Sequence, residues 1–337
     1  MNSRERFFAA LEGRPVDRAP AFPLLMFFAV DRAGISYREF ASEGQAMAEA
    51  QLGLLDRFPL DGVTACSDAF RISGAVGGAM NFPEDKPPHL TEPFIQSPAD
   101  VEKIGRPDPT DPANRMGDRT KAVEIMARSA GDRVAVLGWI DMPFAEACSL
   151  CGVTQFMMML YDDPATAHAI LEAVTPICID FALAQLDAGA PMIGAGDAAA
   201  SLISPAAYRE FALQYEKRVV DAVHGHGGTI KLHVCGDSRA LLADMVTCGA
   251  DLYNVEHMVP LEAARDVYAA NDRCYKGNID PVAIMNSTPE SIARQVHQCL
   301  DIARGTRYMV SAGCEVPAET PDAVFDAFCR AGQTWAG

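Results

Sequence analysis

Basic runs and long hydrophobic runs are scarce in this 337-residue sequence, in which 28 lysines and arginines stand against 45 aspartates and glutamates. The formal net charge of −17 has no compensating basic stretch, so we expect no nucleic-acid partner and no anionic membrane partner. The apolar stretch 19–30 is too short to cross a bilayer. These absences argue against the DNA-binding and membrane-spanning classes of protein.

A targeting segment and a disulfide framework are also missing from the pattern. Residues 1–6 lead into an amphipathic helix and not into an apolar signal region. The ten cysteines are scattered without the regular spacing of a disulfide-bonded domain. We therefore expect reduced thiols and a cytoplasmic location.

Hydrophobic residues make up 49% of the chain and alternate between short strand-like runs and longer helix-like segments. The expected strands cover 20–28, 61–66, 133–140, 190–195, 229–235, 251–255, 273–278 and 307–312. Helical patterns lie between them, among them 206–224, 238–248, 260–270 and 289–304. Eight strands alternating with helices predict a parallel sheet covered on both faces. We predict one α/β domain over 1–337, a (β/α)8 TIM barrel with an N-terminal helical extension; a doubly wound open sheet is the alternative.

One segment, 81–112, breaks this alternation because it is rich in proline and poor in apolar pairs. Long loops inside a compact domain are usually functional covers or disordered connectors. The segment follows the second expected strand, so we predict a wall or lid over the C-terminal mouth of the barrel. A decorated surface loop is the alternative.

The run His233-Val234-Cys235-Gly236, with Cys314 later in the chain, offers one imidazole and two thiols, each near the end of an expected strand. Residues i and i+2 of a strand share a face, so His233 and Cys235 point the same way. Zinc prefers tetrahedral N and S ligands, and three protein ligands with an open fourth position are typical of a catalytic site. The competing interpretation is a core histidine beside two buried, inert cysteines.

Carboxylates follow several of the other expected strands. Asp68 comes after the second strand, Asp141 after the third, Asp197 after the fourth and Glu256 after the sixth. Because active sites of TIM barrels lie at the C-terminal ends of the strands, Glu256 could reach the same point as His233, Cys235 and Cys314. We expect Asp68, Asp197 and Glu256 to be the catalytic carboxylates, and Asp68, Asp141 and Asp197 to orient a substrate or a cationic methyl donor.

Several runs resemble the uroporphyrinogen decarboxylase-like methyltransferases over about residues 3–330. They are Arg-Glu-Arg-Phe-Phe at 4–8, Leu-His-Val-Cys-Gly-Asp at 232–237, Gly-Asn-Ile-Asp-Pro at 277–281 and Ser-Ala-Gly-Cys-Glu-Val-Pro at 311–317. The branch that the chain resembles most is the zinc-dependent methylcobamide:coenzyme M methyltransferases. The resemblance implies a TIM barrel that holds Zn²⁺ through His233, Cys235 and Cys314, with Glu256 as a fourth, displaceable ligand.

The same resemblance implies a reaction that moves a methyl group between a corrinoid and a thiol or another small methyl donor or acceptor. The corrinoid would be supplied by a separate corrinoid protein, because the chain lacks an Asp-x-His-x-x-Gly motif for binding it. True decarboxylases of the superfamily are metal-free and carry an arginine-rich segment after the first strand, whereas 21–29 has no arginine. A metal-free decarboxylase-type lyase and a non-catalytic barrel that binds a corrinoid partner remain the alternatives.

Overall fold

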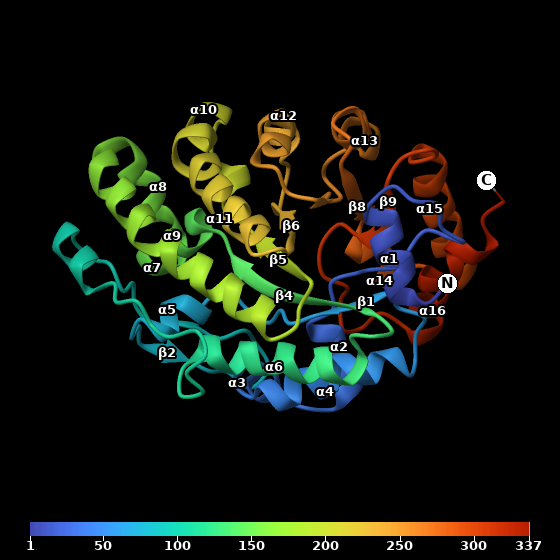
Figure 1. Ribbon diagram of the computed structural model, residues 1–337, viewed down its shortest axis with the longest axis horizontal. Coiled ribbons are helices and arrows are strands. Elements are labelled where there is room, and N and C mark those ends of the chain that lie inside the picture. The colour runs from blue at the N-terminus through green and yellow to red at the C-terminus, as the bar shows by residue number, and fades with distance from the viewer. Residues whose placement is uncertain (337) are drawn as a thin grey trace.

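The computed structural model describes residues 1–336 and has a curled, entirely parallel sheet at its centre (Figure 1). Its seven strands follow one another in sequence order, without the reversal of order that a doubly wound sheet requires. They are β1 (Gly62–Thr64), β4 (Ala135–Asp141), β5 (Met192–Gly196), β6 (Thr229–His233), β7 (Leu252–Asn254), β8 (Cys274–Ile279) and β9 (Tyr308–Ala312). Seven of the eight expected strands are thus confirmed, each within a few residues.

The remaining expected strand, 20–28, which is the first along the chain, does not form a regular strand, so this prediction is wrong. Only two isolated parallel bridges form there, Ala21 with Val310 and Leu24 with Glu315. Pro20 and Pro23 carry no N–H for a ladder, and helix α2 (Phe27–Ala33) begins where the Glu315 carboxylate accepts hydrogen bonds from two main-chain N–H groups.

The segment nevertheless joins the two edges of the sheet. The Phe22 N–H donates to the Val310 carbonyl of β9 at 2.9 Å, and the Asp61 N–H, just before β1, donates to the Ala21 carbonyl at 3.0 Å. The Ala21 N–H in turn donates to the Asp61 carboxylate at 2.7 Å. The fold is therefore the predicted TIM-barrel type, with the irregular segment 20–24 in the place of one strand.

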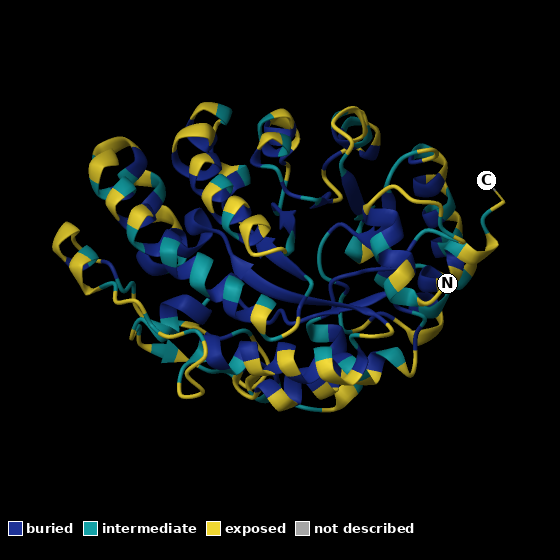
Figure 2. Cartoon of the chain, viewed as in Figure 1, coloured by how far each residue is buried: buried dark blue, intermediate teal, exposed yellow. Residues whose placement is uncertain are grey.

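Helices surround the sheet and bury its outer face, while their own outer faces remain exposed (Figure 2). The layer comprises α4 (Gly44–Leu55), α6 (Arg115–Ala130), α9 (Pro164–Asp187), α11 (Gln214–Gly225), α13 (Leu261–Ala270), α15 (Pro289–Ile302) and α16 (Asp322–Thr334). The predicted N-terminal helix is α1 (Ser3–Leu11). Its Phe7 packs with Phe22, Leu137 and Met309 in an apolar cluster inside the barrel. That cluster fills the interior below the strands' C-terminal ends.

Further short helices occur in the chain segments that connect the strands with the longer helices. They are α3 (Tyr37–Ser42), α5 (Arg71–Ala75), α7 (Pro143–Cys151), α8 (Val153–Asp162), α10 (Pro205–Tyr208), α12 (Leu242–Met245) and α14 (Pro281–Asn286).

Two of the predicted helices differ in detail. The 206–224 pattern is interrupted by a π-helical turn, Arg209–Leu213, between α10 and α11. The 238–248 pattern is mostly 3-10 turns around α12.

The proline-rich segment 81–112 forms a small hairpin and a 3-10 turn, Pro98–Lys103. The hairpin pairs β2 (Met80–Asn81) with β3 (His89–Leu90). The segment is fastened to its neighbours: the Ile95 N–H donates to the Leu150 carbonyl of α7, and Arg106 forms an ion pair with Asp180 of α9. Its expected role as a lid stays a prediction.

Helix α9 alone among the described helices is long and apolar enough to cross a membrane by length and composition. It packs against β4, β5, α7 and α11, and half of its most apolar window is buried there. The core helix of a barrel meets the same criterion.

Candidate metal centre

His233 is the last residue of β6, and Cys235 follows it by two positions, so alternation sends both side chains to the inner face of the sheet. The chain turns immediately afterwards at Gly236, whose φ of +77° is the left-handed conformation that glycine adopts without strain. His233 is buried and Cys235 is partly exposed. The predicted His-x-Cys geometry at a strand end is confirmed.

Cys314 and Glu256 complete the group. One potential ligand atom from each of His233, Cys235, Glu256 and Cys314 lies within 4.8 Å of the others. The His233 Nε2 atom is 3.2 Å from the Cys235 sulfur and 3.7 Å from the Cys314 sulfur. In tetrahedral zinc, an N and an S ligand are separated by about 3.5 Å. The donor set and its spacing therefore fit zinc.

Glycine at position 313 allows Cys314 to approach Glu256. A Cβ atom placed on Gly313 would lie 2.4 Å from the His257 main-chain nitrogen and 2.9 Å from the Glu256 Oε1 atom. Real Cβ atoms do not tolerate such distances, so the loops after β7 and β9 can meet only with a glycine here. Close packing of these two loops brings the fourth predicted ligand to the group.

Neighbouring polar groups orient the ligands. The Nδ1 atom of His233 faces the Asn254 carbonyl at 3.5 Å, which turns Nε2 toward the thiols. The side-chain amide of Asn254 donates to the Gly313 carbonyl at 2.9 Å. The Glu256 Oε1 atom accepts from the His257 N–H at 2.8 Å and from the His257 ring. Such partners outside the ligand shell usually fix ligand orientation in metal sites.

The two thiols affect each other's pKa. The hydrogen bond between them, together with His233, lowers the pKa of Cys314 to about 3 against the opposing effect of burial. The same hydrogen bond, together with burial, raises the pKa of Cys235. Cys314 is therefore the thiol that ionises more readily, and the thiolate is the form in which cysteine binds metals.

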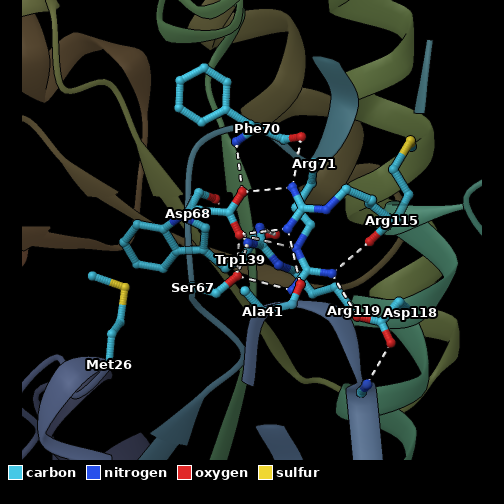
Figure 3. A network of polar contacts seen from close by, with 12 residues as sticks. Met26, Ala41, Ser67, Asp68, Phe70, Arg71, Arg115, Asp118, Arg119 and Trp139 are labelled. Atoms are coloured by element: carbon cyan, nitrogen blue, oxygen red, sulfur yellow. Dashed lines mark hydrogen bonds and ion pairs between the residues drawn. The ribbon is translucent and has the colours of Figure 1, made fainter. Parts of the chain in front are cut away.

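Asp68 lies instead in a buried network with three arginines (Figure 3). Arg115 donates to both of its carboxylate oxygens, at 2.8 and 2.9 Å. Arg71 and Arg119 reach the neighbouring Ser67 hydroxyl, which also donates to Asp68. The three guanidinium groups hold the pKa of Asp68 well below its usual range, against the effect of burial.

Asp197 is fully buried after β5, and neither of its carboxylate oxygens has a hydrogen-bond partner among residues 1–336. Burial, followed by the nearby Glu216 carboxylate, raises its pKa well above the usual range. Its N–H donates to the His233 carbonyl at 2.8 Å. Asp68 and Asp197 are thus outside the four-residue group, and their expected role in orienting a substrate stays a prediction.

Sequence reasoning missed the three arginines and two buried lysines, Lys231 and Lys276. The arginines come from α5 and α6 and not from the strand ends, where catalytic residues of TIM barrels are expected. Lys231 could have been found, because it precedes His233 by two residues and so shares its face.

Comparison with known proteins places this geometry in a family. A family model described as uroporphyrinogen decarboxylase (URO-D) matches residues 2–335. The chain belongs to the uroporphyrinogen decarboxylase family. Curated relatives include a uroporphyrinogen decarboxylase of Hydrogenovibrio crunogenus, 26% identical over 97% of this chain and 96% of that protein. They also include the methylcobamide:CoM methyltransferase MtbA of Methanosarcina acetivorans, 28% identical over 95% and 94%.

Solved structures agree on the fold. A methyltransferase from Methanosarcina mazei superposes with a TM-score of 0.89 at 23% identity and covers 100% of both chains. A B12-independent methionine synthase from Shewanella superposes with a TM-score of 0.55 at 12% identity, over 94% of this chain and 96% of that one. Decarboxylases and a methyltransferase match this chain at nearly equal sequence identity. Identity therefore does not distinguish between the two activities, and the distinction depends on the side chains at the site of this protein.

Proposed function

We propose that this protein is a zinc-dependent methyltransferase that moves a methyl group between a corrinoid carried on a separate protein and a thiol or other small methyl donor or acceptor. The observation that carries the proposal is the cluster of one imidazole, two thiols and one carboxylate within 4.8 Å. Soft sulfur ligands select zinc among the common divalent ions. The likeness to MtbA, whose name describes methylcobamide and CoM, supports the substrate class.

The four residues of the cluster would have different roles. His233, Cys235 and Cys314 would hold the metal, and Glu256 would occupy a fourth position from which an incoming ligand displaces it. Bound zinc would act as a Lewis acid that lowers the pKa of an incoming thiol. The thiol sulfur would then form a bond to the methyl carbon as the cobalt–carbon bond breaks. Cobalt would keep that electron pair as Co(I), and the thiol proton would leave to solvent.

The decarboxylase alternative has less support in the described residues. Holding a substrate with many carboxylates requires arginines with free donors. The terminal nitrogens of Arg71, Arg115 and Arg119 are already bonded to Asp68, Asp118, Ser67 or main-chain carbonyls. The reduced state of the ten cysteines is in keeping with a cytoplasmic location, which we include in the proposal.

The test combines metal content and turnover. We expect about one zinc per purified chain, and loss of that zinc in Cys235→Ala and Cys314→Ala. Wild-type protein should transfer methyl from methylcobalamin to at least one thiol in a panel, followed by the absorbance change of cobalamin. Both variants should lose at least roughly 10³-fold in rate, because the Lewis acid is gone.

Cys299→Ala is the matched control, since Cys299 is a buried cysteine on α15 outside the four-residue group. It should keep its zinc and its rate. Turnover of uroporphyrinogen by metal-free protein would favour the lyase instead. Bound zinc without turnover of any thiol, methylated amine, ether or sulfide would favour a non-catalytic barrel that binds a corrinoid partner.

A further inference from the structure

Two lysines are buried in the interior of the barrel, Lys231 on β6 and Lys276 on β8, each 1% exposed. Lysine is almost never fully buried without a partner that compensates its charge. No carboxylate forms an ion pair with either ammonium among residues 1–336. Burial of these two ammonium groups therefore requires compensation by other groups inside the barrel.

Lys231 lies directly below the metal ligands. It shares the inner face of β6 with His233, two residues further on, and residues so spaced are roughly 7 Å apart. Its ammonium group is 4.3 Å from the centre of the Trp139 ring. The three residues Trp139, Gly194 and Lys231 are paired in register across β4, β5 and β6.

Gly194 makes that contact possible. A Cβ atom at Gly194 would lie 2.6 Å from the Trp139 ring, so only glycine leaves room for the indole to cross β5 and reach Lys231. The ring offers its negative face to the ammonium. Beyond this contact, the structure records no hydrogen bond for the Lys231 ammonium among residues 1–336.

Lys276 occupies a similar position two strands away. Its ammonium group donates to the Phe22 carbonyl at 2.6 Å and lies 4.3 Å from the centre of the Phe22 ring. Burial lowers the pKa of Lys231 to about 8 and the pKa of Lys276 well below its usual range. The sulfurs of Cys66, Cys314 and Cys235 oppose this shift at Lys231, and the Cys314 sulfur opposes it at Lys276. Two of these sulfurs belong to predicted metal ligands.

We propose that Lys231 and Lys276 form a buried cationic layer that compensates the negative charge of the thiolate-bearing metal site and so strengthens its hold on the metal. The inference rests on the zinc site of the proposed function. Zinc with two thiolates and one carboxylate retains one net negative charge, and a thiolate that displaced Glu256 would leave the released carboxylate beside it as a second. These charges are poorly solvated in a largely buried site, so a cation beneath them replaces missing water.

This layer explains why the lysines carry no carboxylate partners. A carboxylate in the same layer would cancel the cations and leave the anionic metal site uncompensated. Aromatic rings and a carbonyl satisfy the ammonium groups without cancelling their charge. Lys231 and Lys276 are accordingly positioning residues that act through the metal ligands and make no contact with substrate.

The test is zinc affinity, measured by competition with a chromophoric chelator at constant pH on full-length Lys231→Met, Lys276→Met and wild-type protein. Methionine fills a similar volume without charge. At an effective dielectric constant of about 20 and a separation of roughly 7–12 Å, losing one unit charge should weaken zinc binding by roughly 10- to 50-fold. Lys121→Met, which removes the same charge from an exposed site on α6, should leave the affinity unchanged.

Thermal unfolding of the metal-free proteins separates this role from simple packing. We expect metal-free Lys231→Met to be at least as stable as metal-free wild type, because a buried ammonium costs stability when the anionic metal site is absent. If Lys231→Met does not fold, Lys276→Met carries the test. Unchanged affinity in the folded variants would overturn this inference alone. Wild-type protein that binds no zinc would overturn the proposed function and this inference with it.

Discussion

The two halves of the barrel mouth treat their charged groups in opposite ways. On the side of β1 and β4, Asp68 lies among three arginines and both of its carboxylate oxygens have hydrogen-bond partners, although the Nε atoms of the three arginines have none among residues 1–336. On the side of β6 to β9, two thiols, a carboxylate and an imidazole converge within 4.8 Å of one another. A carboxylate surrounded by cations holds loops together, whereas converging nitrogen, sulfur and oxygen donors suit an added cation. On the proposed function, the contrast separates a structural half from a functional half.

Removal of the Asp68 charge tests the structural half and has the largest expected effect on stability. In Asp68→Asn, three buried guanidinium groups lose their main counter-ion, so we expect the free energy of unfolding to fall by roughly 3–5 kcal/mol. Urea unfolding followed by circular dichroism measures it. Zinc content should stay at about one equivalent.

Asp132→Asn is the matched control, because the Asp132 side chain is 84% exposed and its nearest arginine nitrogen is 3.9 Å away. Its stability should change by no more than about 0.5 kcal/mol. If Asp68→Asn were as stable as wild type and yet inactive, Asp68 would be a substrate-binding group, and the division of the mouth would fail.

Glu256→Gln tests the functional half. A neutral amide is a much poorer zinc ligand than a carboxylate, so zinc affinity should fall by at least the roughly 10- to 100-fold typical of losing a partner outside the ligand shell. His257→Gln alters only the group that orients this carboxylate and should have a smaller effect. Equal zinc affinity in wild type and Glu256→Gln would remove Glu256 from the ligand set.

The smallest expected effect concerns Glu216, a buried carboxyl group near Asp197. Burial raises the pKa of Glu216 from 4.5 to about 7, so the folded protein keeps a proton that the unfolded chain releases. Stability should therefore fall as the pH rises from about 4.5 through about 7, and then level off. Glu216→Gln keeps an acceptor for the Tyr208 hydroxyl and removes this loss.

We expect Glu216→Gln to be more stable than wild type by about 1 kcal/mol or more at pH 8, and by less at pH 5. Urea unfolding at both pH values measures the difference. A stability difference that is the same at pH 5 and pH 8 would show that Glu216 does not hold the proton.

The sequence was sufficient to predict the seven regular strands and the convergence of the ligands. Both depend on local rules: alternation along a strand and the position of a residue at a strand end. The irregular segment at 20–24 could not be predicted in the same way. It depends on hydrogen bonds to Asp61 and Val310, which are remote in sequence.

The arginine network was missed for a similar reason. Arg115 and Arg119 project from α6 and meet Asp68 only after the intervening segment has folded back. Apolar periodicity does not reveal which buried polar groups will pair. Likewise, the contact between Lys231 and Trp139 depends on the placement of Gly194 between them, which requires the register of three strands.

X-ray absorption at the zinc edge of the purified protein tests the central claim most directly. The account predicts a four-coordinate shell with two sulfur atoms at about 2.3 Å and two nitrogen or oxygen atoms at about 2.0–2.2 Å. A shell without sulfur, a shell of four sulfurs, or protein that retains no zinc would contradict it.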